Sequence, residues 1–350
     1  ELEGAHIQII DKTGKVVEEW TSKRDETTGL IKHVVEGLHT GEEYTLRETV
    51  APAGYTIASD TKFTIDQNGV VSSTGTVAKD GTLLVEDNLT KVKVSKVDIA
   101  NGKEVAGAHI QIIEVVKGKK EIIRAQWDSE TTAKEVEGLA AGVTYTLRET
   151  VAPEGYTVKT DTTFTLDENG NVNGGTTHTE NGVLLIEDAK TKGVVSKRDI
   201  DGGAEIAGAQ LQVVETNAEG KVNVVENCTS EAGVSHAIEG LKTGVTYTLR
   251  ETVAPAGYTV ATATKFSIGT DGKVTTLGNT STDKDGNTVL LVEDAKTTVK
   301  VSKVDAANNE EIAGAHIQIR NEAGDVVVVN GNKVEWTSDG TAHVIRGLKI

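Results

Sequence analysis

Hydrophobic and polar residues alternate in short runs along this chain of 350 residues. Runs with a period of two occur at 92–95, 109–112, 145–148 and 164–166. This period is typical of half-buried β-strands, whereas an amphipathic helix has a period of about 3.6 residues. The runs are separated by turn signals at Asn101-Gly102, Asn169-Gly170, Asn181-Gly182 and Asp271-Gly272. We therefore expect many short strands, and a loop rather than a helix after Trp127.

The alternating runs recur at a long, regular interval, which is the mark of a repeat protein. The segment Tyr-Thr-Leu-Arg-Glu-Thr-Val-Ala-Pro begins at Tyr44, Tyr145 and Tyr247, with spacings of 145 − 44 = 101 and 247 − 145 = 102. We expect two complete repeats at 91–190 and 191–297, a first repeat at 1–90 that lacks its opening strand, and a truncated fourth repeat at 298–350. About seven short strands in a repeat of this size predict an Ig-like β-sandwich. The predicted fold is all-β, with the tandem sandwiches arranged as an elongated rod.

The rare residue types fall at repeated positions, which indicates structural roles. Aromatic residues make up 3% of the chain, methionine is absent, and there are three prolines and one cysteine. Trp20, Trp127 and Trp336 share one position in the repeat, and Cys228 occupies this position in the third repeat. We interpret Cys228 as a small apolar substitute, because a catalytic thiol needs a base that the other repeats also lack. One cysteine cannot form an internal disulfide, so the repeats need another kind of crosslink.

The charge and hydropathy of the chain exclude several classes of function. With 36 basic and 53 acidic residues the net charge is −17, which disfavours binding to nucleic acid or to anionic membranes. No apolar run of about 18 residues predicts a membrane span, and no signal peptide is visible. Because the sequence starts at Glu1, we expect a mature or excised piece.

Three ionisable residues of the second repeat lie in strands that are otherwise apolar on one face: Lys96, Glu149 and Asp188. Burial disfavours the charged form of such groups, so each is costly alone. Together they can react, since a neutral amine is a nucleophile, a carboxyl carbon is an electrophile, and a protonated second carboxyl can polarise the carbonyl. The product is a Lys–Asp amide, formed with loss of water. Glu187 is an alternative acceptor, but the period of two places Asp188 on the apolar face and Glu187 on the outer one.

Several segments of the third repeat together resemble a known family. They are Ser-Lys-Arg-Asp at 196–199, Glu-Ile-Ala-Gly-Ala at 205–209, Tyr-Thr-Leu-Arg-Glu-Thr-Val-Ala-Pro-Ala-Gly-Tyr at 247–258 and Leu-Val-Glu-Asp-Ala at 291–295. They look like the Cna B-type repeat of Gram-positive adhesins and pilins, also called the SpaA-like or prealbumin-like domain. The resemblance extends over the whole chain and implies a prealbumin-like β-sandwich. It also implies a spontaneous isopeptide bond between a lysine on the first strand and an asparagine or aspartate on the last, promoted by a glutamate.

The resemblance implies a role for each matching residue. In the second repeat Lys96 is the amine, Asp188 the acceptor and Glu149 the proton shuttle, and in the third repeat these roles fall to Lys197, Asp294 and Glu251. The first repeat keeps Glu48 and Asp87 without a lysine, and the fourth keeps Lys303 without the carboxyls. We expect that neighbouring segments of a longer array complete these halves. The alternative is strand exchange, in which Lys303 of one molecule reaches Asp87 of the next.

Weaker signals compete with this interpretation. His6, His109 and His316 share one position in the repeat, and His33, His236 and His343 share another. Gln210 and Lys134 interrupt these series and no third ligand recurs, so we expect no metal site. The segment from Asp283 to Asn287 is similar to the start of a calcium loop but lacks its closing glutamate, which favours a hairpin turn. Without the resemblance, a lysine at the end of a strand is usually a solvated charge.

The sequence thus predicts a structural stalk or fibre shaft of an adhesin or pilus, extracellular and attached to the cell surface or cell wall. Its expected partners are neighbouring repeats of the same protein, and host matrix through a domain outside these residues. We expect no cofactor and no enzymatic turnover beyond a single crosslinking event per repeat. The alternative function is a binding module whose repeats grip a host matrix protein or glycan.

Overall fold

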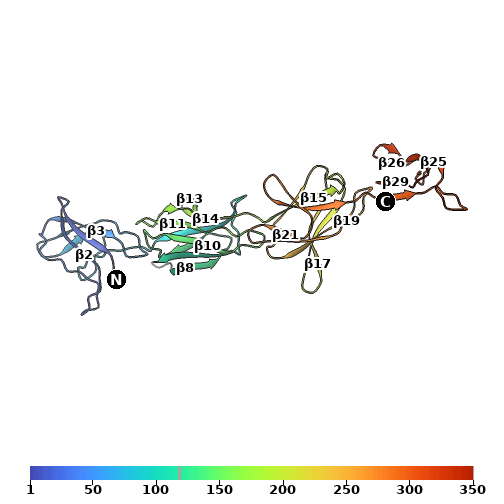
Figure 1. Ribbon diagram of the computed structural model, residues 1–350. Helices are drawn as coiled ribbons and strands as arrows, with labels where there is room; N and C mark the ends of the chain where they lie inside the picture. Colours follow the sequence, from blue (N-terminus) through green and yellow to red (C-terminus); the bar gives the residue numbers. More distant parts are fainter. Residues whose placement is uncertain (117–119, 350) are drawn as a thin grey trace. The chain divides into compact units, whose positions relative to one another are not determined.

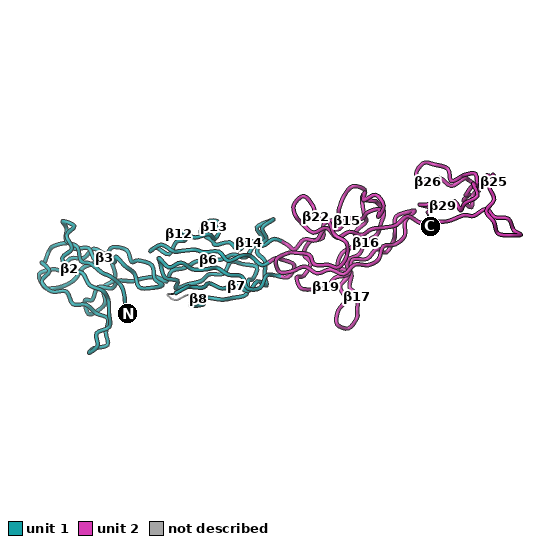
Figure 2. Tube along the Cα trace, in the orientation of Figure 1, with its two compact units in different colours: residues 1–153, 158–189 teal, residues 154–157, 190–350 magenta. Residues whose placement is uncertain are grey.

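The computed structural model describes residues 1–116 and 120–349, and the elements found in these residues are all β-strands. By compactness the chain divides into two units, one made of residues 1–153 and 158–189 and the other of residues 154–157 and 190–350 (Figure 2). Across the described ranges, no helix has the length and apolar character of a membrane span. The prediction of an all-β chain is confirmed.

The second repeat contains two sheets, in which most of the strand pairs are antiparallel (Figure 1). The five-stranded sheet has the order β12-β11-β10-β7-β8, and the four-stranded sheet has the order β13-β14-β6-β9. The strands are β6 (Lys91–Asp98), β7 (His109–Val116), β8 (Lys120–Asp128), β9 (Lys134–Glu137), β10 (Tyr145–Val151), β11 (Thr162–Leu166), β12 (Val172–Gly175), β13 (His178–Glu180) and β14 (Val183–Asp188). The described residues of this repeat form nine strands, where about seven were expected, because β12 and β13 are short and carry almost no apolar residues from which a pattern can be read.

The core of this repeat lies between its two sheets. The five-stranded sheet contributes Ile110, Ile112, Tyr145, Leu147, Phe164 and Leu166, and the four-stranded sheet contributes Val92, Val94, Val136, Leu184 and Ile186. The rings of Tyr145 and Phe164 stack with centroids 5.5 Å apart. Each strand points alternate side chains into this layer, which is the packing of a β-sandwich.

The first and last strands of the repeat lie side by side and run parallel. In the register of β6 and β14, Lys96 is opposite Ile186 and Asp98 is opposite Asp188. The other strand pairs of the repeat are antiparallel. The chain therefore returns to its own starting strand, which brings residues about 90 positions apart into contact.

The third repeat has the same architecture, with sheets β17-β16-β19-β20-β21 and β18-β15-β23-β22. Its strands are β15 (Lys192–Asp199), β16 (Gln210–Thr216), β17 (Val222–Thr229), β18 (His236–Glu239), β19 (Thr246–Val253), β20 (Thr264–Ile268), β21 (Val274–Thr276), β22 (Thr280–Thr282) and β23 (Thr288–Asp294). The first and last strands, β15 and β23, again pair in parallel.

The first repeat forms only the five-stranded sheet, in the order β2-β1-β3-β4-β5. Its strands are β1 (His6–Asp11), β2 (Val16–Thr21), β3 (Glu43–Val50), β4 (Thr61–Ile65) and β5 (Val71–Ser73). In the second repeat β6 lies between β14 and β9, and residues 1–90 contain no counterpart of β6. Residues 33–36 and 82–87, which correspond to β9 and β14, therefore have no central strand to pair with and form no strand themselves.

The fourth repeat contains three two-stranded ladders, β24-β29, β25-β28 and β26-β27. The strands are β24 (Thr298–Val301), β25 (Ala313–Gln318), β26 (Val328–Val329), β27 (Asn332–Lys333), β28 (Glu335–Asp339) and β29 (His343–Arg346). Without the later strands of a complete repeat, these ladders do not join into the two sheets of a sandwich.

A buried threonine joins the first and second repeats within the first compact unit. Thr90 Oγ1 donates to the carbonyl of Leu139 at 2.7 Å, and the Thr90 N–H donates to the carbonyl of Gly54 at 3.0 Å. The N–H of Gly138 in turn donates to the carbonyl of Thr90 at 3.0 Å. In the other unit the same contacts recur at Thr191, with Gly155, Gly240 and Leu241, and at Thr297, with Gly257, Gly347 and Leu348.

Candidate functional site

The second repeat contains a buried pair formed by its first and last strands. Lys96 Nζ lies 2.5 Å from Asp188 Oδ1, and the side chains are 1% and 0% exposed. Lys96 Nζ also donates to the carbonyl of Ile186 at 3.4 Å. The alternation along β14 buries Leu184, Ile186 and Asp188 together, so the parallel pairing of the two strands sets the amine beside the carboxyl.

The opposite sheet supplies the third ionisable group. Glu149 follows the buried Tyr145 and Leu147 on the inward face of β10, and its Oε1 lies 3.4 Å from Lys96 Nζ. Its other oxygen, Oε2, accepts a hydrogen bond from the Lys159 N–H at 2.7 Å. This main-chain contact fixes the orientation of the carboxyl, and it leaves Oε1 directed at the lysine and aspartate.

Burial raises the pKa of both carboxyls of the site. Burial raises the pKa of Glu149 to about 7, against the lowering effects of the Lys159 N–H and the Lys96 charge. Burial also raises the pKa of Asp188, against the close contact and positive charge of Lys96. Glu149 therefore holds a proton up to near-neutral pH, as a proton donor to this site must.

The cluster has few other partners for its charges. Among the described residues, Glu149 Oε1 and both oxygens of Asp188 lack a hydrogen bond of normal geometry, although Lys96 is close to them. A buried ion pair without further hydrogen bonds recovers only part of the desolvation cost of its charges. Conversion of the amine and the acid into a neutral amide removes that cost, so the environment favours condensation.

The third repeat reproduces this arrangement with Lys197, Glu251 and Asp294. Lys197 Nζ contacts Asp294 Oδ1 and lies 3.4 Å from Glu251 Oε1, in a site where the three side chains are at most 2% exposed. Glu251 Oε2 accepts a hydrogen bond from the Ala261 N–H at 2.6 Å. Burial raises the pKa of Glu251 to about 7, as it does for Glu149.

The first repeat brings its two carboxyls together without a lysine from its own residues. Glu48 Oε2 accepts from the Ala58 N–H at 2.6 Å. Burial raises the pKa of Glu48 to about 7, and the charge of Asp87 adds to this effect. Burial also raises the pKa of Asp87. A hollow of about 440 Å³ borders Glu48, Ala58 and Val85.

The structure places the remaining predicted residues as follows. Lys303 is exposed, just beyond the end of β24, and is not part of a carboxyl cluster in the described residues. Glu187 points outward, where its Oε1 lies 3.1 Å from His178 Nδ1. The inward orientation of Asp188, expected from the period of two, is confirmed.

Sequence reasoning missed the main-chain donors that hold the three glutamates. Ala58, Lys159 and Ala261 each stand ten residues after the glutamate whose Oε2 they bind. The recurring distance is a signal in principle. A main-chain donor nevertheless sets no requirement on residue type, so the sequence offers nothing to single out these positions.

The repeated histidines contact aromatic rings and polar groups. His33 stacks on Trp20 and His343 stacks on Trp336, in both cases with centroids 4.3 Å apart. His6 Nδ1 lies 2.6 Å from Thr49 Oγ1, and His109 Nδ1 lies 2.7 Å from Asp128 Oδ1. Within the described ranges, no group of three potential metal ligands is present.

The loop that begins at Asp283 is a turn closed by its own hydrogen bonds. Asp283 Oδ1 accepts from the N–H groups of Asp285 and Asn287 at 2.9 and 2.8 Å. These bonds use the oxygen that a calcium loop would direct at the ion, which agrees with the expected hairpin turn.

Comparison with known proteins gives a family match. Residues 1–79, 90–180 and 191–290 match the family model described as the SpaA prealbumin-like fold domain, which covers more than half of the chain. No curated protein sequence matches the chain. The matched ranges contain Glu48, Lys96, Glu149, Lys197 and Glu251.

Solved structures of low sequence identity resemble the chain. The Bacillus anthracis TIE protein is 16% identical with a TM-score of 0.37, over 98% of this chain and 61% of that one. A C-terminal fragment of the pilus adhesin SpaC from Lactobacillus rhamnosus GG is 19% identical with a TM-score of 0.35, over 60% of this chain and 98% of that one. The shaft pilin SpaA of the same bacterium is 15% identical with a TM-score of 0.25, over 59% and 98%. The chain thus spans about three fifths of the length of the first of these proteins.

Proposed function

Because the chain belongs to the family of SpaA prealbumin-like fold domains, we propose that its complete repeats crosslink themselves through Lys–Asp isopeptide bonds and form part of a stalk or shaft on a cell surface. The observation that carries this proposal is the contact of Lys96 with Asp188 beneath Glu149, in a site closed to solvent. The same three residue types meet in the third repeat.

The proposed reaction is a condensation of amine and acid. Transfer of a proton from the Lys96 ammonium to the Asp188 carboxylate gives the two neutral groups, and the free electron pair of Nζ then attacks the Asp188 carboxyl carbon. Glu149 donates its proton to a carboxyl oxygen and receives one from Nζ as the tetrahedral species collapses. The C–N bond forms, the C–OH bond breaks, and one water leaves for each repeat.

The fold supplies most of the rate enhancement in this scheme. Packed strands hold the amine in contact with the carboxyl, which replaces a bimolecular encounter by a reaction of very high effective concentration. Each cluster reacts once, so the protein is not an enzyme with turnover. The bond of the third repeat joins Lys197 to Asp294 by the same steps, with Glu251 as the proton shuttle.

A stalk benefits from this bond for a physical reason. The repeats have 3% aromatic residues and one cysteine in the whole chain, so large aromatic cores and disulfides are not available to stabilise them. By analogy with disulfides, closing a loop of about 90 to 100 residues stabilises the folded state by about 4 to 5 kcal/mol. An amide also resists reduction, which suits an extracellular location.

Peptide mapping tests the proposal directly. Digestion of the unmodified chain should yield one branched peptide that joins the segments around Lys96 and Asp188, and a second that joins those around Lys197 and Asp294. Recovery of these four segments as separate linear peptides from folded protein would contradict the proposed bond formation.

A further inference from the structure

Cys228 occupies a position that a tryptophan ring fills in the other three repeats. Strand register defines the position, since Trp20 is opposite Ile7, Trp127 opposite Ile110 and Trp336 opposite Ile317. Cys228 is opposite Leu211, which is the equivalent of these isoleucines in the third repeat. Its side chain packs against the core there, as the sequence interpretation expected.

In the first and fourth repeats the tryptophan ring lies flat on a histidine. Trp20 stacks on His33 with an angle of 16° between the ring planes, and Trp336 stacks on His343 with an angle of 12°. The second repeat has Lys134 in place of this histidine and keeps Trp127. In these two repeats, which have both residues, the tryptophan ring thus stacks flat on the imidazole.

The third repeat keeps the histidine at the same strand position and with the same glutamate partner, but it lacks the tryptophan ring. His236 is opposite Val195 on β15 and corresponds to His33. His33 Nε2 lies 2.6 Å from Glu18 Oε1, and His236 Nε2 lies 3.3 Å from Glu226 Oε1. Glu18 and Glu226 are equivalent in register. Nε2 of His236 therefore contacts a glutamate, as Nε2 of His33 does. The face of the His236 ring, however, has no tryptophan stacked on it, whereas Trp20 covers the face of His33.

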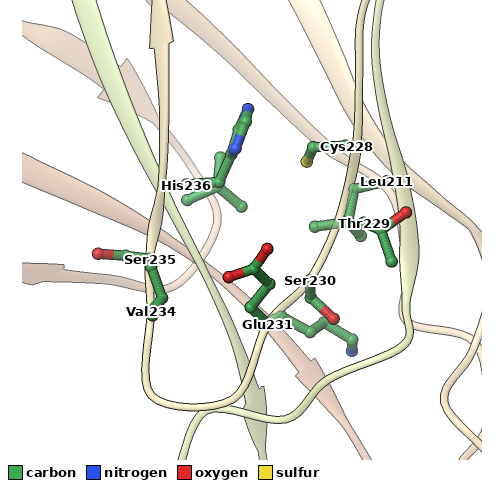
Figure 3. A pocket seen from close by; sticks show the side chains of 10 residues that line it. Leu211, Cys228, Thr229, Ser230, Glu231, Val234, Ser235 and His236 are labelled. Carbon is green, nitrogen blue, oxygen red and sulfur yellow. The ribbon is translucent and has the colours of Figure 1, made fainter.

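A hollow of about 160 Å³ opens at this place, lined by residues that include Leu211, Cys228, Ser230, Glu231, Val234 and His236. Figure 3 shows Cys228 and His236 on opposite sides of the hollow, with the carboxylate of Glu231 directed between them. An engineered cavity of about 150 Å³ accepts a benzene molecule, so this volume suffices for a small aromatic ring system.

We propose that this hollow binds a small planar aromatic molecule of the indole class, stacked on His236 where the other repeats carry their own tryptophan ring. The apolar walls at Leu211 and Val234 fit the ring, and the Glu231 carboxylate offers an acceptor for the indole N–H. The ligand is a free molecule rather than a side chain of a partner. The volume of about 160 Å³ is matched to a ring alone.

The site is independent of the proposed isopeptide bond. Lys197 lines the inner end of the hollow, but its amine is engaged with Asp294 and Glu251. Binding of the ring relies on the hollow and on the face of His236, which do not change when the amide forms.

The test uses Cys228, the one cysteine of the chain, as a reporter. The full chain is alkylated with iodoacetamide, and the rate is followed by intact mass with and without indole. Bound indole covers the thiol, so at a concentration of about ten times its Kd the rate should fall about tenfold, because only the unoccupied fraction reacts. Cyclohexanol, which is of similar size but not planar, should give no protection. An unchanged rate at millimolar indole, or equal protection by cyclohexanol, would overturn the proposal.

Variants separate the hollow from the thiol. Cys228→Trp restores the residue of the other repeats and should abolish indole binding in saturation-transfer NMR, whereas Cys228→Ala keeps the hollow and should still bind. His236→Ala should weaken binding by at least about fivefold, because the stacking face is removed. Indole binding to Cys228→Trp at the strength of the unmodified chain would place the ligand elsewhere and refute the assignment.

Discussion

Lys96 Nζ lies 2.5 Å from Asp188 Oδ1, although 188 − 96 = 92 positions separate the two residues in the chain. The parallel pairing of β6 with β14 creates this contact, and the opposing sheet adds Glu149 to it. The first and last strands of the repeat thus meet at a site whose groups are suited to join them covalently.

Glu149→Gln should leave the second repeat folded but without its bond. The amide side chain keeps the size of the glutamate and the contact to the Lys159 N–H, but it cannot donate and recover a carboxyl proton. We expect intact mass to show the loss of one water instead of two. Glu187→Gln is the matched control, because Glu187 points outward. The chain that carries this substitution should still show the loss of two waters. Full crosslinking of Glu149→Gln would eliminate the proton shuttle from the mechanism.

Lys96→Ala should change the mechanical response of the second repeat. With the bond in place, tension that enters at Lys96 passes directly to Asp188, so the residues between them bear no force. Without it, single-molecule pulling should show one additional unfolding step about 90 residues long, and the repeat should lose about 4 to 5 kcal/mol of stability. Such steps from the second and third repeats of the unmodified chain would contradict this force path.

The first repeat should become less stable as the pH rises from about 4.5 to above 7. The pKa of Glu48 is about 7 in the folded state and 4.5 in its ordinary environment, so folding retains a proton that the unfolded chain has lost in this range. The contribution of Glu48 to the stability of the first repeat is complete below pH 4.5 and is lost as the pH rises through 7. Hydrogen exchange of the β3 amides, corrected for intrinsic rates, should report this trend, and Glu48→Gln should flatten it. Equal protection at pH 5 and pH 8 in the unmodified chain would argue against a buried, protonated Glu48.

Gly54→Ala should weaken the contact between the first and second repeats. A Cβ at Gly54 would lie 2.7 Å from the carbonyl oxygen of Gly138, and the residue has a positive φ of 89°. Gly81 has a similar φ of 84° but nothing within 4 Å of its Cβ position, so Gly81→Ala measures the backbone strain alone. In chemical denaturation, Gly81→Ala should lower the free energy of unfolding by about 1 to 2 kcal/mol. Gly54→Ala should lower it by about 1 to 3 kcal/mol more. Identical losses in the two variants would show that the close approach to Gly138 is unimportant.

The orientation of the site residues is predictable from local sequence. Alternate side chains of a strand lie on opposite faces, so the apolar Leu184 and Ile186 predict that Asp188 points inward and Glu187 outward. The structure confirms this orientation by burial. The repeat itself limits the search further, because Lys96, Glu149 and Asp188 have counterparts at Lys197, Glu251 and Asp294.

Pairing and packing are less accessible from sequence. The parallel register of β6 and β14 depends on how the whole sandwich closes, and no local pattern specifies it. The loss of the four-stranded sheet in the first repeat follows from the central place of β6, which becomes visible only in the topology. Likewise, sequence identifies Cys228 as a substitute for tryptophan, but whether a hollow remains depends on how far its neighbours collapse.

The mass of the intact, folded chain tests the central claim most directly. If Lys96 joins Asp188 and Lys197 joins Asp294, each bond releases one water, and the measured mass is lower than the sequence mass by two waters. Because the bonds are amides, the deficit persists after full denaturation and reduction. A folded chain with the unmodified sequence mass would contradict the account.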